Sequence, residues 1–148
     1  MKPKILAIIV SLVVFASVFA AFLTIGSPTK QRKLNFDSDR VNDLQTIQSQ
    51  IVNYWQQKNT LPANLGELTD SISGFTAPKD PENNTDYEYF VKSNLSFQLC
   101  ANFNLPSLSN QKAIPQIYPS SDNWDHTAGR ACFDRTIDPE LYKSVSPR

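Results

Sequence analysis

The sequence is poor in the residues on which enzymes and zinc sites most often depend. Its 148 residues include one histidine, His126, and two cysteines that have no histidine at zinc-ligand spacing. His126 stands beside Asp125 in a polar stretch, without a Cys-His or Ser-His-Asp signature around it. We therefore predict a protein that is not an enzyme, with His126 in a structural or surface role. A hydrolase centred on His126 is the catalytic alternative.

An excess of charge of one sign is also absent. The chain has 14 basic and 14 acidic residues and no long run of either, a balance that argues against nucleic-acid binding. Glycine is scarce as well, with 4 residues against 10 prolines. This composition favours one domain with long, turn-rich connections over a repeat protein or a doubly wound sheet.

The most prominent feature that is present is an apolar stretch near the N-terminus. Residues 5–25 (ILAIIVSLVVFASVFAAFLTI) carry no charge, and as a helix they would extend about 31 Å, the thickness of a hydrocarbon core. We predict an N-terminal transmembrane helix, with residues 1–28 as the membrane anchor, because Pro28 lacks a backbone donor and should end or kink the helix. A cleaved secretory signal peptide and a buried helix of a soluble protein are the alternatives.

The basic residues on the two flanks of this stretch give little preference for either orientation in the membrane. Lys2 and Lys4 precede it, whereas Lys30, Arg32 and Lys33 follow it, so the positive-inside rule almost cancels. The short first flank and the even number of cysteines favour a cytoplasmic N-terminus. We expect a single-pass membrane protein whose domain is extracytoplasmic.

The remaining sequence predicts an α+β fold in which an amphipathic helix packs on a small antiparallel sheet. A helix is expected from Asp37 or Ser38 to Lys58–Asn59, because apolar residues recur there every three or four positions. Strands are expected at residues 87–92, 95–103 and 129–134. A hairpin turn is expected at residues 92–94, and a long loop at 104–127. We assign residues 29–136 to the domain and 137–148 to a flexible tail.

Two sets of residues in this domain are candidate sites. Cys100 and Cys132 lie in strand-like stretches, and a disulfide between them would stabilise the domain by about 3–4 kcal/mol; buried free thiols are the alternative if the domain faces the cytoplasm. Oxygen-bearing side chains alternate in the stretch at 80–86, a spacing that suits calcium: Asp80, Glu82, Asn84 and Asp86. The EF-hand glycine and final glutamate are missing there, so a solvated Asx and proline turn is the favoured interpretation. No other cofactor is expected.

The order of these features resembles the type IV pilin and type II secretion pseudopilin superfamily, especially the major pseudopilin type. The resemblance depends on residues 43–55 (DLQTIQSQIVNYW), on Leu61-Pro62 with Leu65 and Leu68, on Asp80-Pro81 and on Tyr87-Glu88-Tyr89. It implies a helix packed on an antiparallel sheet, calcium sometimes held after the Asp-Pro element, and a C-terminal region bounded by a disulfide, which Cys100 and Cys132 fit.

The N-terminus departs from that family. Pilins carry a glycine, a phenylalanine and a glutamate at a processing site before the apolar helix, whereas here Gly26 follows the helix and no acidic residue lies within it. We therefore expect no cleavage by a prepilin peptidase. The expected function is that of a membrane-anchored, pilin-like structural or interaction protein. Its expected partners are the membrane and other pilin-like or secretion-system proteins, and it would serve as an accessory of a type II secretion or type IV pilus system. An extracytoplasmic ligand- or calcium-binding sensor is the alternative.

Overall fold

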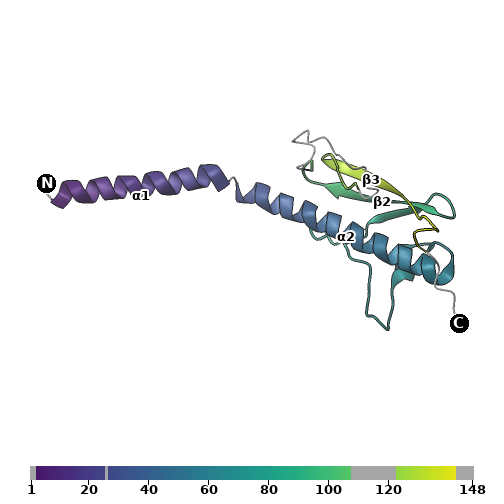
Figure 1. Cartoon of the computed structure of the whole chain (residues 1–148). Helices are drawn as coiled ribbons and strands as arrows, with labels where there is room; N and C mark the ends of the chain where they lie inside the picture. Colours follow the sequence, from purple (N-terminus) through teal and green to yellow (C-terminus); the bar gives the residue numbers. More distant parts are fainter. Residues whose placement is uncertain (1–2, 26, 108–122, 143–148) are drawn as a thin grey trace. The chain divides into compact units, whose positions relative to one another are not determined.

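The structure is a computed structural model that describes residues 3–25, 27–107 and 123–142. Two helices come first, α1 (Pro3–Ile25) and α2 (Pro28–Lys58), followed by a short 3-10 helix, η1 (Leu65–Leu68). Three strands follow: β1 (Glu88–Val91), β2 (Ser96–Phe103) and β3 (Gly129–Thr136) (Figure 1). The chain divides into two compact units, Met1–Leu34 and Asn35–Arg148. The predicted α+β class is confirmed.

In α1 the described side chains are those at positions 4, 5, 8 and 10–19, and all of them are exposed. Leu12, Val13, Val14 and Phe15 are 66%, 59%, 54% and 77% exposed. Four consecutive helical residues project about 100° apart, so these apolar side chains face every side of α1. A search limited to the described residues finds no helix with both the length and the apolar character needed to cross a membrane. The predicted anchor stays a prediction.

The second helix, α2, begins earlier than the sequence analysis predicted. We expected its start at Asp37 or Ser38, but it starts at Pro28, where the backbone N–H of Lys30 donates to the carbonyl of Ser27 at 2.9 Å. Proline is favoured at the first helical position because its missing N–H needs no partner there. Pro28 therefore begins α2, three residues after α1 ends at Ile25.

The predicted end of α2 is confirmed. Asn59 adopts a left-handed conformation with φ of 56°, and its N–H donates to the carbonyl of Trp55 at 2.7 Å. This is the usual single-bond helix cap, in which a left-handed residue follows the last helical turn.

The three strands form one antiparallel sheet in the order β1-β2-β3, and one face of it lies along the second half of α2 (Figure 1). The hairpin turn predicted at residues 92–94 is confirmed, since the N–H groups of Lys92 and Ser93 both donate to the carbonyl of Ser96. The apolar residues of β2 alternate with polar ones and face the helix. With buried apolar residues of α2, β3 and the connecting segments they form the core. It contains Leu44, Ile47, Ile51, Trp55, Leu68, Tyr87, Phe97, Leu99, Ala101, Phe103, Trp124, Phe133 and Ile137.

The core continues beyond residue 136, where the sequence analysis began a tail. Ile137 is 2% exposed, and its N–H donates to the carbonyl of Leu95 at 2.8 Å. Tyr142 packs against the same core. The rest of the expected tail, 143–148, and most of the expected loop, 108–122, lie outside the described residues.

Candidate functional site: the Arg40 cluster

Among the described residues of the domain, buried polar groups gather around Arg40, which is 2% exposed. Arg40 lies on the same helical stripe as Leu44, Ile47 and Ile51, at spacings of four, three and four residues, so α2 directs its guanidinium into the domain. A charge on that stripe needs partners, because an isolated ion is costly to bury.

Three carboxylates supply those partners. Asp80 receives the Nε–H of Arg40 at 2.7 Å and its Nη2–H at 3.0 Å, in a two-point contact. Asp37, one turn earlier in α2, accepts from Nη1 at 2.8 Å, and Glu82 accepts from Nη2 at 2.7 Å. Such paired contacts between guanidinium and carboxylate are among the strongest hydrogen bonds in proteins.

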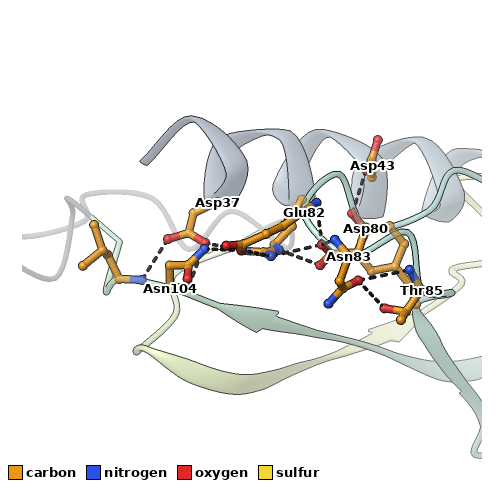
Figure 2. Close-up of polar contacts among 10 residues, drawn as sticks. Asp37, Asp43, Asp80, Glu82, Asn83, Thr85 and Asn104 are labelled. Carbon is orange, nitrogen blue, oxygen red and sulfur yellow. Dashed lines mark hydrogen bonds and ion pairs between the residues drawn. The ribbon is translucent and has the colours of Figure 1, made fainter. Parts of the chain in front are cut away.

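The same carboxylates also bind the chain that follows β2. The Oδ1 and Oδ2 atoms of Asp37 accept the backbone N–H groups of Asn104 and Leu105, each at 2.8 Å. The side-chain amide of Asn104 donates to Glu82 at 2.7 Å. Figure 2 shows Asp37, Asn104, Glu82 and Asp80 gathered beside α2. The Arg40 cluster, defined as Arg40 with Asp37, Asp80, Glu82 and Asn104, therefore joins α2, the 80–86 loop and the end of β2.

These contacts change the pKa of the groups involved. Burial alone would raise the pKa of Asp80, but the Arg40 guanidinium and the N–H groups of Glu82 and Asn83 outweigh it and hold the pKa below its ordinary value. The pKa of Glu82 is also lowered, by the Asn104 amide first and by Arg40 second. Burial alone would lower the pKa of Arg40, yet its carboxylate partners raise it. All three groups are therefore charged at neutral pH.

The structure separates the four residues that were predicted as calcium ligands. Asp80 and Glu82 both contact Arg40, whereas Asp86 forms an exposed ion pair with Lys79 at 3.3 Å. Asn84 is exposed and adopts a left-handed conformation with φ of 60°. Over the residues described here, no group of three or more His, Cys, Asp or Glu side chains is arranged to hold a metal ion.

The backbone of the 80–86 loop forms the Asx turn that the sequence analysis favoured. The Oδ1 atom of Asp80 accepts the N–H of Glu82 at 2.9 Å and that of Asn83 at 3.3 Å. Asn83 in turn accepts from the N–H and the hydroxyl of Thr85 (Figure 2). Asp80 thus accepts hydrogen bonds both from the backbone of its own loop and from Arg40. The loop is fixed by these contacts within the protein.

The two cysteines are brought together as predicted. Cys100 and Cys132 are directly paired positions of β2 and β3 and are joined by a disulfide. They lie on the face of the sheet that points away from α2. Beside them, Arg130 of β3 pairs with Glu88 of β1 at 2.7 Å, so a disulfide and an ion pair connect all three strands on that face.

His126 lies in the domain interior and is 7% exposed. Its ring stacks on Phe103 with 3.6 Å between the ring centroids. The Ser107 hydroxyl accepts the backbone N–H of His126 at 3.2 Å. The same hydroxyl donates to the carboxylate of Asp125 at a long 3.4 Å. The stack on Phe103 fits the structural role that was predicted for His126.

No protein-family model, curated protein or solved structure matches this chain. Arg40 was not among the residues predicted from the sequence, and Asp37 was expected only as a possible start of α2. The available signal was the position of Arg40 on the apolar stripe of α2, where a buried charge requires carboxylates from elsewhere in the chain. Its distant partners Asp80 and Glu82 were identified as candidate site residues, but as ligands of calcium rather than as partners of an arginine.

Proposed function

We propose that this chain is a membrane-anchored, pilin-like structural or interaction module, with α1 in the lipid and the α+β domain outside the cytoplasm. The observation that carries the proposal is the exposure of apolar side chains on every side of α1. A helix that is apolar all round is suited to a membrane span or to the centre of a large core. The uncharged length of residues 5–25 suits the span.

The pilin-like part of the proposal is supported by the order of elements in the domain. A long helix, α2, packs on a three-stranded antiparallel sheet, and a disulfide closes the region between β2 and β3. The absence of an acidic residue from residues 5–25 favours a permanent anchor over a filament subunit. We therefore propose an accessory role beside a type II secretion or type IV pilus system, with other pilin-like proteins as partners.

Alkaline carbonate extraction of membranes from cells that express the full chain tests the anchor. We expect the wild-type chain and a Val13→Leu control to stay in the membrane pellet, and a Val13→Arg variant to be depleted from it. An arginine at the centre of a span costs about 2.5–3.5 kcal/mol on insertion scales. Recovery of the wild-type chain in the extract, or a mature N-terminus beyond residue 20, would contradict a permanent anchor.

The side of the membrane is tested on the same cells. Protease added to spheroplasts should digest the domain, and non-reducing mass spectrometry should find the peptides of Cys100 and Cys132 joined. Protection of the domain together with free thiols would place it in the cytoplasm, where disulfides rarely persist.

The interaction role is tested by crosslinking from Ile72, which is 96% exposed. The Asp70 carboxylate holds this turn by accepting the N–H groups of Ile72 and Ser73. A photoreactive residue at position 72 should give crosslinks to pilin-like or secretion-system proteins, identified by mass spectrometry. The matched control is exposed Asn94 in the turn between β1 and β2. Products shared by both positions, or none from either, would count against a specific partner.

A further inference from the structure

The charges of the chain are distributed very unevenly around the start of α2. The first 34 residues contain Lys2, Lys4, Lys30, Arg32 and Lys33 and no acidic residue, so the other 114 residues hold 9 basic and all 14 acidic residues. Lys30, Arg32 and Lys33, which we call the basic collar, follow the apolar stretch directly and are exposed. A chain with zero net charge thus has a net charge of +5 over its first 34 residues and of −5 over the rest.

The basic collar also opposes the usual charge pattern of a helix. It lies in the first two turns of α2, a helix whose first turn contains no acidic residue. The N-terminal end of a helix carries partial positive charge, and each cation placed there is unfavourable by about as much as an anion is favourable, ~0.3–1 kcal/mol. Natural proteins tend to break such local rules at functional positions. An anionic surface against the start of α2 would offset both the side-chain charges and the helix dipole.

We propose that the basic collar binds the headgroups of anionic phospholipids, and so holds the start of α2 at the membrane surface. This inference depends on the anchor proposed above, because α1 places residues 27–34 next to the headgroup layer only if it occupies the lipid. The collar lies five to eight residues after the end of the apolar stretch at Ile25, and basic residues in that position are attracted to an anionic surface over about one Debye length. The chemistry is that of phosphate oxygens that accept from ammonium and guanidinium groups.

Amide hydrogen exchange on the full chain in lipid vesicles tests the proposal. Peptides that cover residues 28–36 should exchange more slowly in vesicles that contain phosphatidylglycerol than in phosphatidylcholine alone, by about fivefold for each contacting lysine. High salt should remove the difference. At low salt the Lys30→Gln/Lys33→Gln double variant should keep only the part of the difference that is due to Arg32, about fivefold.

The control variant is Lys92→Gln, which removes an exposed lysine in the turn after β1 and should behave as the wild type. Equal exchange in the two vesicle types, or a double variant identical to wild type, would overturn the proposal. The same would follow if inorganic phosphate alone protected residues 28–36 of the chain in phosphatidylcholine vesicles, because a lipid surface would then be unnecessary. Release of the chain from both vesicle types by carbonate would contradict the proposed anchor itself. A chain that stays in the vesicles but shows equal exchange in both would contradict only the proposed lipid binding by the collar.

Discussion

The two helices of this protein contain similar apolar residues but use them differently. In α1 the described apolar side chains are exposed on every side, and Phe15 is 77% exposed. In α2 the apolar residues follow one stripe, and Leu44, Ile47 and Ile51 are each 0% exposed beneath the sheet. The difference lies in the polar residues, which occupy the other side of α2 and are almost absent from α1. Polar spacing, more than apolar content, therefore distinguishes the one-sided apolar stripe of α2 from the all-round apolar surface of α1.

The largest effect is expected where the buried stripe of α2 carries charge. An Arg40→Ala variant leaves Asp37 and Asp80 buried without their cation, and we expect its free energy of unfolding to fall by about 3–5 kcal/mol. Urea unfolding of the full chain in detergent measures the loss. The control is Arg130→Ala, which breaks the exposed pair with Glu88 and should cost about 0–1 kcal/mol. Equal losses in the two variants would show that the Arg40 cluster does not stabilise the domain.

A smaller effect separates the apolar residues of the two helices. Ile51→Val removes one methylene group from the core of α2, so the free energy of unfolding of the domain should fall by about 0.5–1.5 kcal/mol. Ile8→Val makes the same change in α1, where Ile8 is 65% exposed, and should leave the domain unchanged. Thermal melting of the detergent-solubilised chain, followed at the domain signal, measures both. A comparable loss from Ile8→Val would mean that α1 belongs to the cooperative unit of the domain.

This comparison also shows what the sequence could and could not predict. Local patterns were sufficient for the end of α2 and the turn after β1, because each depends on spacing or alternation within a short segment. Cys100 and Cys132 are 32 residues apart, and their pairing could be predicted because they are the two cysteines of the chain and both lie in strand-like stretches. The start of α2 was misplaced because Pro28 was considered only as the end of the first helix, whereas proline is also favoured at the first position of a helix. The Arg40 cluster was missed because Arg40 and Asp80 are 40 residues apart, and local periodicity says nothing about such partners.

A change of pH between 7 and 5 should affect stability less than these substitutions do, and the effect should come from His126. Burial lowers the pKa of His126, although the Thr127 carbonyl and the carboxylates of Asp37 and Asp125 act in the opposite direction. The folded pKa lies below the unfolded one, so the unfolded chain takes up the proton first as pH falls. Stability should therefore be full above about pH 6.5 and decrease as pH falls from there to the folded pKa. In His126→Phe, which keeps a ring against Phe103, urea midpoints between pH 7 and 5 should vary less; an unchanged pH profile would assign the effect elsewhere.

Calcium is expected to have the smallest effect, because the domain already supplies a cation to the 80–86 loop. Arg40 contacts both Asp80 and Glu82, and an incoming cation would have to displace its guanidinium from a buried site. We expect millimolar calcium to leave the melting temperature of the wild-type chain unchanged, as it should that of Asp86→Ala, which removes an exposed carboxylate paired with Lys79. A rise in the wild type that Asp86→Ala abolishes would instead show that the loop binds calcium through its exposed oxygens. It would also favour the sensor alternative, because the loop would then respond to a ligand while its buried side stayed fixed by Arg40.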